Sequence, residues 1–260
     1  MLKQRVLTAV AALSTLLIVL FMLPPVIKQV VIIVLILIGA WEWSGLLKLE
    51  SMLMRLAYVI LIAAFLTIAS FGVVDDITID IVLKFTLVWW LMMPIWMFMF
   101  PTPIPILVGW ICGMFVLIPT YFAISSLQPD ILLSLLIIVW MTDTGAYFTG
   151  KHLGKVKLAP RISPKKTWEG VFGGLLVVAV LALLTARWLQ IDIVVLLPFC
   201  LAVAIISIIG DLTVSMFKRN AGVKDSGRLF PGHGGLLDRI DSVAAAAPLF
   251  VLGINWMGLK

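Results

Sequence analysis

Long, uninterrupted apolar runs dominate the sequence, as in VVIIVLILIGAW at residues 30–41. Hydrophobic residues make up 63% and charged residues 12% of the chain, against about 45–50% and about 25% in a soluble domain. A water-facing globule of 260 residues cannot bury so much apolar surface, so lipid must be the solvent for most of the chain. In lipid every backbone polar group needs an internal partner, which leaves helices or closed barrels, and barrel strands would alternate apolar and polar residues. The runs therefore predict transmembrane helices.

Nine stretches reach the length of about 20 mainly apolar residues that a membrane span requires. They are 6–23, 29–47, 56–74, 81–100, 104–126, 131–149, 169–187, 191–210 and 242–258. The first follows Lys3 and Arg5 as in a signal peptide, but it ends in Pro24-Pro25 without a small-residue cleavage site, so we interpret it as an uncleaved helix. The predicted fold class is an all-α, polytopic transmembrane helical bundle of about nine spans.

Basic residues fall on one side of this predicted bundle. When the loops are assigned alternately to two sides, the side of the N-terminus holds every Lys and Arg except Lys28, Lys84, Arg187 and Lys260. Loops rich in Lys and Arg remain in the cytoplasm, so we expect a cytoplasmic N-terminus and a bacterial-type inner-membrane location. The net charge of +6 then reflects membrane orientation, and no soluble module is left to bind nucleic acid.

Few polar residues interrupt the first half of the chain. Glu42 and Lys84 lie near or within predicted spans, where each is expected to be paired or to reach the membrane surface. Cys112 and Cys200 lie in apolar runs and are expected to be small buried residues without a disulfide or a metal. We expect residues 1–130 to form a scaffold with lipid or dimer contacts and residues 131–260 to form the catalytic region.

Polar residues of the second half gather in three blocks, each at the cytoplasmic end of a predicted span. The first block is TDTGAY at 142–147. Its Asp143 follows a long apolar run, where an ionised carboxylate requires a partner or a metal unless it has simply reached the interface. Gly145 would let another helix or a ligand approach closely.

The second block is SPKKTWEG at 163–170, just before a predicted span. Thr167 can act as the N-cap of that helix. Ser163, Lys165 and Lys166 then lie beside free backbone N–H groups, an arrangement that suits phosphate oxygens. A basic loop with an ordinary helix cap explains the same residues equally well.

The third block, 210–242, mixes acidic and basic residues in a way that membrane orientation does not require. The acidic residues are Asp211, Asp225, Asp238 and Asp241, and the basic ones are Lys218, Arg219, Lys224, Arg228 and Arg239. If 205–219 is helical, Asp211, Ser215 and Lys218 share one face, and Asp238 and Asp241 share another if 236–242 opens the last helix. Glycines around His233 predict a turn that exposes backbone N–H groups.

Facing carboxylates are costly without a cation between them, and hard oxygen ligands suit Mg²⁺. Adjacent lysines and arginines would neutralise phosphate charge. The pattern therefore predicts metal-assisted phosphoryl or nucleotidyl transfer. His233 is the single histidine of the block, so a zinc site is not expected.

The third block resembles the signature of the phosphatidate cytidylyltransferase (CDP-diacylglycerol synthase) family. The matching residues are Ser215, Lys218-Arg219, Lys224-Asp225, Pro231-Gly232-His233-Gly234-Gly235 and Asp238-Arg239-Ile240-Asp241. The segments 143–147 and 163–170 also look like family segments. One position differs: where family members commonly have Glu before the signature Ser, this chain has Val214. If that Glu is a metal ligand in relatives, the metal shell here must be completed otherwise.

The resemblance implies a reaction in which the phosphate of phosphatidic acid attacks the α-phosphorus of CTP, giving CDP-diacylglycerol and pyrophosphate. It implies Mg²⁺ and, as in some family members, a potassium-type second cation (K⁺) and a homodimer. Metal ligands and near neighbours are then expected among Asp211, Asp238, Asp143, Asp225 and Asp241. Catalytic roles are expected for Asp211, Asp238, Lys218, Arg219 and Asp241. Substrate contacts are expected from Ser163, Lys165, Lys166, Thr167, Ser215, Lys224, His233 and Arg239.

Two other functions remain open from the sequence. A transporter of an anionic solute would also have many spans, but its site would lie near the membrane midplane between repeats, and no repeat is visible. A CTP-dependent polyprenol kinase is closer in chemistry, and it would release CDP rather than pyrophosphate. A purely structural membrane protein would leave the aspartates unexplained.

Overall fold

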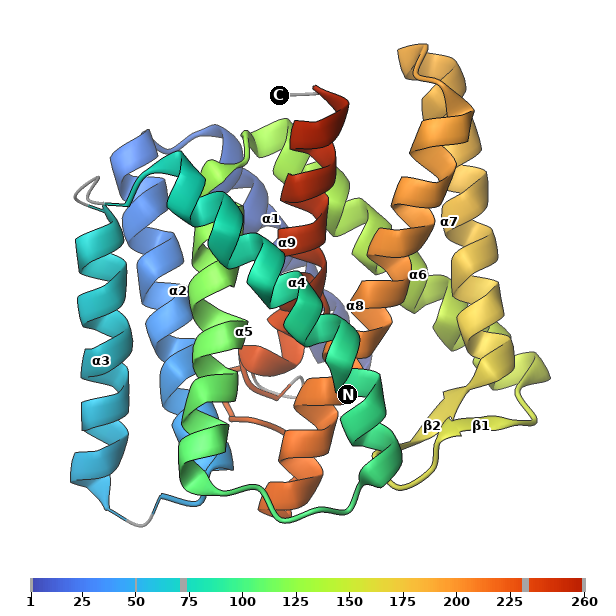
Figure 1. The fold of residues 1–260 in the computed structure, drawn as a ribbon. Helices are drawn as coiled ribbons and strands as arrows, with labels where there is room; N and C mark the ends of the chain where they lie inside the picture. The colour runs from blue at the N-terminus through green and yellow to red at the C-terminus, as the bar shows by residue number, and fades with distance from the viewer. Residues whose placement is uncertain (1, 50, 71–73, 231–233, 259–260) are drawn as a thin grey trace.

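The computed structural model describes residues 2–49, 51–70, 74–230 and 234–258, and this part of the chain forms nine α-helices and one two-stranded sheet (Figure 1). The helices are α1 (Leu2–Phe21), α2 (Pro25–Leu46), α3 (Met52–Ser70), α4 (Asp76–Met99), α5 (Ile106–Ser126), α6 (Pro129–Leu153), α7 (Trp168–Leu189), α8 (Ile193–Ala221) and α9 (Leu237–Met257). Eight of them, α2 to α9, are long and apolar enough to cross a membrane. The predicted all-α polytopic bundle is confirmed.

Several helices continue past the predicted spans, and the extensions of α8 and α9 carry polar residues of the site. α6 ends at Leu153 rather than 149, α8 at Ala221 rather than 210, and α9 begins at Leu237 rather than 242. Hydropathy marks where lipid contact ends, whereas a helix continues as long as its backbone hydrogen bonds do. Gly222, in the left-handed conformation, ends α8.

A short β-hairpin between α6 and α7 was not predicted. Its strands are β1 (Lys157–Ala159) and β2 (Ser163–Thr167), paired antiparallel. Thr167 ends β2 and caps α7, since its side chain accepts a hydrogen bond from the N–H of Gly170 at 3.2 Å, as predicted. The hairpin is fixed to the bundle where Arg219 donates to the carbonyl of Ile162 at 3.0 Å. β2 is therefore held beside α8.

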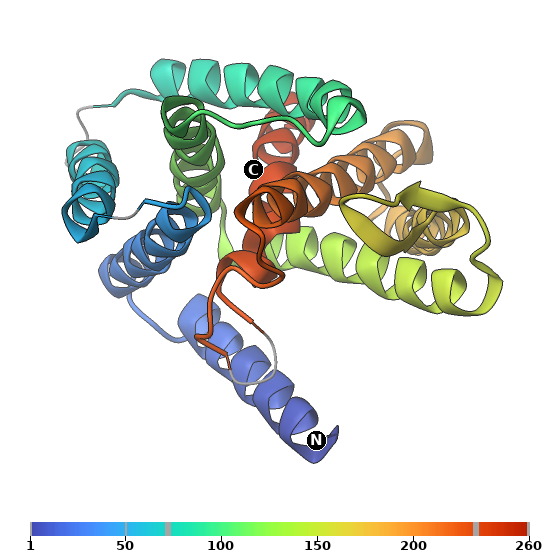
Figure 2. The ribbon, with the colours of Figure 1, turned by 90° about the horizontal axis from the view of Figure 1, so that it is seen from below.

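Glycines allow the helices that carry the polar blocks to approach closely. A Cβ at Gly145 of α6 would lie 3.0 Å from the carbonyl oxygen of Gly173 in α7, so the predicted close approach is that of a helix. A Cβ at Gly210 of α8 would lie 2.5 Å from the carbonyl oxygen of Asp241 in α9. Figure 2, seen from below, shows α8 and α9 crossing at the centre of the bundle. The close contact of α8 with α9 at Gly210 brings Asp211 beside α9.

We expect Gly210→Ala to lower the free energy of unfolding by about 1–3 kcal/mol, the usual cost of overpacking a core. The added methyl would meet backbone that cannot move independently of α9. Thermal unfolding in detergent micelles measures the effect. The matched control is Gly39→Ala, whose methyl would meet the flexible end of Leu117 at 3.1 Å. Equal melting temperatures for the two variants would contradict this packing.

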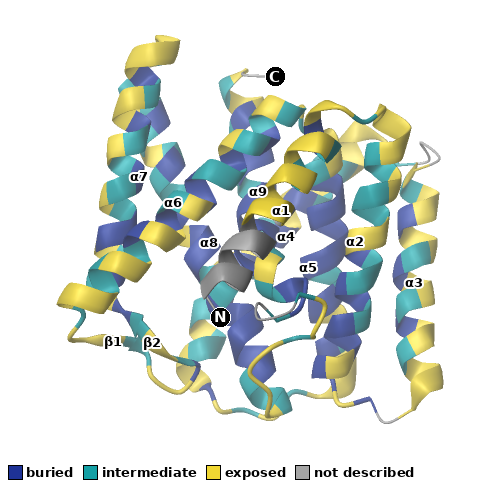
Figure 3. Cartoon of the chain, turned by 180° about the vertical axis from the view of Figure 1, so that it is seen from behind, coloured by how far each residue is buried: buried dark blue, intermediate teal, exposed yellow. Residues whose placement is uncertain are grey.

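The interior of the bundle joins its two halves, and its outside is apolar. Trp43 of α2 packs against Phe217 of α8 with ring centroids 4.7 Å apart. Cys112 and Cys200 are buried and free, as predicted. Figure 3 shows buried residues concentrated on central helices such as α5, while α3 and α7 expose much of their length. Large exposed apolar residues on those outer helices, such as Ile60 and Leu176, suit contact with lipid.

Candidate active site

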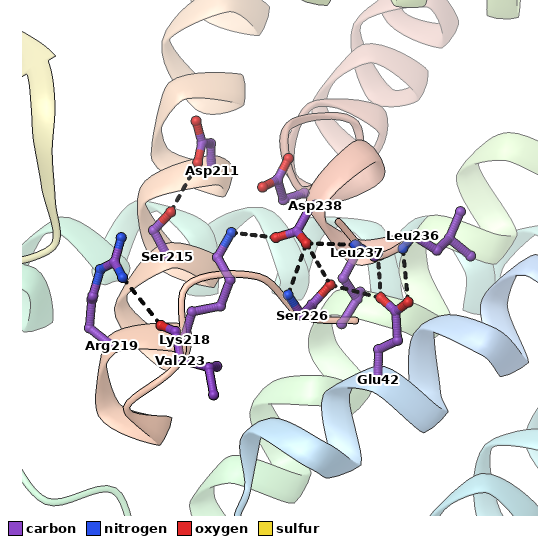
Figure 4. Close-up of polar contacts among 12 residues, drawn as sticks. Glu42, Asp211, Ser215, Lys218, Arg219, Val223, Ser226, Leu236, Leu237 and Asp238 are labelled. Atoms are coloured by element: carbon purple, nitrogen blue, oxygen red, sulfur yellow. Dashed lines mark hydrogen bonds and ion pairs between the residues drawn. The ribbon is translucent and has the colours of Figure 1, made fainter. Parts of the chain in front are cut away.

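The polar ends of α6, α8 and α9 meet β2 at one end of the bundle. The predicted polar face of α8 is confirmed: the Ser215 hydroxyl donates to Asp211 at 3.1 Å, and Lys218, one turn further on, reaches Asp238 of α9 (Figure 4). The connections α2–α3, α6–α7 and α8–α9 lie at this same end, and together with the helix turns next to them they carry most of the basic residues (Figure 1).

The outer part of the site is accessible to solvent. Lys166 of β2 forms an ion pair with Asp211 of α8, with Nζ 2.6 Å from Oδ2, and both side chains are about a quarter exposed, at 26% and 27%. Asp143 of α6 is exposed and lies close enough to Lys166 and Asp211 to interact electrostatically with both. A mobile anionic group could therefore reach two carboxylates and one ammonium group here.

The inner part is a buried ion pair between Lys218 and Asp238, with Nζ 2.6 Å from Oδ1 and side-chain exposures of 9% and 7%. The other carboxylate oxygen of Asp238 accepts from the N–H of Ser226 at 2.8 Å, the N–H of Gly235 at 2.9 Å and the Ser226 hydroxyl at 3.1 Å. Asp238 is thus fixed by four donor contacts. The fixed Asp238 carboxylate in turn holds the ammonium group of Lys218 in place.

Asp241 is a buried residue that interacts electrostatically with members of both ion pairs. It is 7% exposed and interacts electrostatically with Asp211, Lys218 and Lys166. One of its carboxylate oxygens accepts from the N–H of Ser242 at 2.8 Å. Gly210 of α8 lies against the backbone of this same residue. Asp241 therefore brings a further carboxyl group near Asp211.

The oxygen donors fit a divalent cation that is shared with substrate. Within the described ranges, no three Asp, Glu, His or Cys side chains lie close enough together to hold a metal ion by themselves. Mg²⁺ in proteins usually takes only one or two carboxylates and completes its shell with water and substrate phosphates. Asp211, with Asp143 and Asp241 near it, would supply such carboxylates.

Arg219, which was predicted for the site, and Val214, which replaces a common family Glu, have contacts with the framework of the bundle. Arg219 donates to the backbone carbonyls of Ile162 and Val223, so the contacts that the structure shows for it are structural. Val214 is fully buried in the apolar core and adds no oxygen ligand.

Five further residues predicted for the site are exposed or partly exposed, and one lies outside the described residues. The partly exposed Ser163 and the exposed Lys165 are on β2, and Lys224 and Asp225 are exposed in the α8–α9 connection. Arg239 is exposed on the first turn of α9. His233 lies outside the described residues. The metal role of Asp225 and the substrate contacts of the other residues stay predictions.

Sequence reasoning missed the contribution of α2 to this end of the bundle. The Glu42 carboxylate accepts hydrogen bonds from the N–H groups of Leu236 and Leu237 and from the Ser226 hydroxyl. Glu42 is therefore paired, as expected, but with the start of α9. Its only sequence signal is an acidic residue at the end of a long apolar run. Lys84, the other exception in the first half, pairs with Asp80 at 2.6 Å.

Comparison with known proteins gives full-length matches. The model of the cytidylyltransferase family matches residues 3–257. A phosphatidate cytidylyltransferase of Pseudomonas aeruginosa is 38% identical over 262 residues, covering 96% of each chain. One of Haemophilus influenzae is 34% identical over 280 residues, covering 96% of this chain and 97% of its own. One of Staphylococcus aureus is 50% identical over 115 residues, or 44% of each chain.

Proposed function

The chain belongs to the cytidylyltransferase family, and from this we propose that it transfers CMP from CTP to phosphatidate at the carboxylate and lysine cluster of α6, α8 and α9. The products are CDP-diacylglycerol, a precursor in phospholipid biosynthesis, and pyrophosphate. Full-length similarity to relatives named phosphatidate cytidylyltransferase supports the activity. The observation that carries the site assignment is the partly exposed Lys166–Asp211 pair directly beside the buried Lys218–Asp238 pair.

In this reaction a phosphate oxygen of phosphatidate forms a bond to the α-phosphorus of CTP. The bond from that phosphorus to the bridging oxygen of the β-phosphate breaks, and pyrophosphate leaves with the electron pair. Both substrates are anions, so the main tasks of the protein are to hold them together and to neutralise their charge. Lys166 and Lys218, on separate elements, supply positive charge from two sides.

The accessible pair also provides a way to admit substrate. Lys166 is a quarter exposed, so its ammonium group can exchange Asp211 for a phosphate oxygen without being taken out of water. Asp211 would then be free to bind a divalent cation, with Asp143 or Asp241 beside it. A bound Mg²⁺ would neutralise the triphosphate and make the α-phosphorus more electrophilic. The second, potassium-type cation stays a prediction from the family resemblance.

We place the site at the cytoplasmic face of the bacterial inner membrane. Its end of the bundle carries most of the basic residues, which favours the cytoplasm. CTP is water-soluble and cytoplasmic, and the phosphatidate headgroup lies at the membrane surface. A site at the cytoplasmic ends of the helices is accessible to both substrates. Homodimer formation stays a prediction.

CTP labelled separately at the α- and γ-phosphates tests the function. Purified protein in vesicles that contain phosphatidate and Mg²⁺ should place α-label in lipid and γ-label in pyrophosphate. Lipid that carries γ-label, with CDP in solution, would instead show a CTP-dependent lipid kinase. An absence of label in lipid with both labelled forms of CTP would contradict CMP transfer to phosphatidate.

We expect Lys166→Met to raise KM for CTP about tenfold, the effect of losing about 1.4 kcal/mol of binding free energy. Stability should change little, because exposed ion pairs contribute about 0–1 kcal/mol. Initial rates at varied CTP concentration and thermal unfolding measure the two effects. Lys157→Met, on the other strand of the same hairpin and exposed, is the control. If both variants raise KM equally, a diffuse basic surface rather than Lys166 binds CTP.

A further inference from the structure

Glu42 is a buried carboxylate that reaches the site from the opposite half of the chain. It lies on α2 and is 6% exposed. Its Oε1 accepts from the N–H of Leu236 at 2.9 Å, and its Oε2 accepts from the N–H of Leu237 at 2.9 Å and from the Ser226 hydroxyl at 2.8 Å (Figure 4). These three donors offset the cost of burying its charge.

The carboxylate of Glu42 replaces the missing cap of α9. Leu236 is the N-cap residue and has no side chain that can accept from the first turn. The first N–H groups of a helix have no partner within it, and the positive end of the helix dipole lies there. Glu42 satisfies two of these groups from a different helix. It therefore fixes where α9 begins, and Asp238 is in that first turn.

Ser226 connects Glu42 to the catalytic ion pair. Its hydroxyl oxygen is 2.8 Å from Glu42 and 3.1 Å from Asp238, but a hydroxyl has one proton and can donate to only one of them at a time. The connection is closely packed, because a Cβ at either Gly227 or Gly235 would overlap the Glu42 carboxylate. Glu42, Ser226 and Asp238 therefore form one hydrogen-bonded unit.

We propose that Glu42 is a positioning residue for CMP transfer: through the start of α9 and the Ser226 hydroxyl it sets the Asp238–Lys218 pair against the reacting phosphates. This inference rests on the proposed function. When Lys218 turns its charge toward a substrate phosphate, Asp238 loses a donor. The Ser226 proton can then rotate from Glu42 to Asp238, while Glu42 keeps its two backbone donors.

Glu42→Gln is the primary variant. An amide has one acceptor oxygen, so its NH₂ group would face a backbone N–H that needs an acceptor. Ser226→Ala removes only the shared hydroxyl, and Asp80→Asn removes a carboxylate from an exposed pair on α4 as the control. Each full-length protein is purified in detergent and checked to be monodisperse and helical. The kcat and the KM values for both substrates are then measured.

We expect Glu42→Gln to lower kcat by about 10- to 100-fold, in the range for misplacement of a catalytic group by about 1 Å, with both KM values within about threefold of wild type. Ser226→Ala should lower kcat about fivefold, the factor for one lost hydrogen bond. The double variant should lose less than the product of the two factors, because both act through one hydroxyl. Asp80→Asn should match wild type.

A folded Glu42→Gln protein with wild-type kcat would overturn the inference, and so would fully multiplicative losses in the double variant. A purely structural role would lower the folded fraction and leave kcat per folded molecule unchanged. If Glu42→Gln does not fold, Ser226→Ala decides: a wild-type kcat overturns the inference and a reduced kcat supports it. A wild-type protein that transfers no CMP to phosphatidate would overturn the proposed function itself.

Discussion

Asp211→Asn should lower kcat for CMP transfer by about 100- to 1,000-fold, the range for removing one preorganised group that stabilises charge in a transition state. The amide keeps the shape of the side chain and an acceptor for Ser215, but it cannot balance Lys166 and is a weaker ligand for a divalent cation. Label transfer from α-labelled CTP to lipid measures the rate. The fold should persist, because the Lys166–Asp211 pair is partly exposed.

Asp80→Asn provides the matched control for charge removal. Asp80 also pairs with a lysine at 2.6 Å, but on the exposed surface of α4. It should keep wild-type kcat. An Asp211→Asn protein with kcat within about threefold of that control would remove Asp211 from the reaction, since a direct role in stabilising charge is worth far more.

Lys218→Met should lower the free energy of unfolding by about 3–5 kcal/mol and abolish most activity. The substitution leaves Asp238 buried without its counter-ion, which is the most costly way to break a buried ion pair. Unfolding in mixed micelles measures the stability. The control is Lys84→Met, whose i,i+4 pair with Asp80 has side-chain exposures of 65% and 40% and should contribute less than about 0.5 kcal/mol.

A second substitution separates stability from catalysis at the same position. Lys218→Met combined with Asp238→Asn removes both charges, so much of the lost stability should return. Activity should not return, because the lysine that we propose faces the phosphates is still absent. Recovery of activity together with stability would show that Lys218 acts only in folding. Equal destabilisation by Lys218→Met and Lys84→Met would contradict the buried pair.

The spans could be predicted because lipid imposes a length and an apolar composition on each helix. Helical periodicity predicted that Asp211, Ser215 and Lys218 share one face, and the preferences of N-cap residues predicted that Thr167 caps a helix. These are local rules. The helix ends were less accurate, because α8 and α9 continue into polar sequence where hydropathy carries no signal.

The contacts that sequence reasoning missed join distant segments. Glu42 contacts Leu236 across 194 positions, and no periodicity links the two. Arg219 belongs to a basic pair typical of phosphate binding, and its catalytic role stays a prediction; its guanidinium also donates to the carbonyl of Ile162, in a hairpin whose strands are too short to predict. The division at residue 130 stays a prediction, although Glu42 shows that the first half supports the site.

Binding of Mn²⁺, observed by electron paramagnetic resonance as loss of the free-ion signal, tests most directly whether this cluster holds a cation together with substrate. Purified protein would be titrated with Mn²⁺ and a CTP analogue that has a methylene bridge between the α- and β-phosphates and so cannot react. We predict one tightly bound Mn²⁺ per chain in wild type and in Asp80→Asn, and none in Asp211→Asn. Equal tight binding in Asp211→Asn, or none in wild type, would contradict a shared metal site at these helix ends.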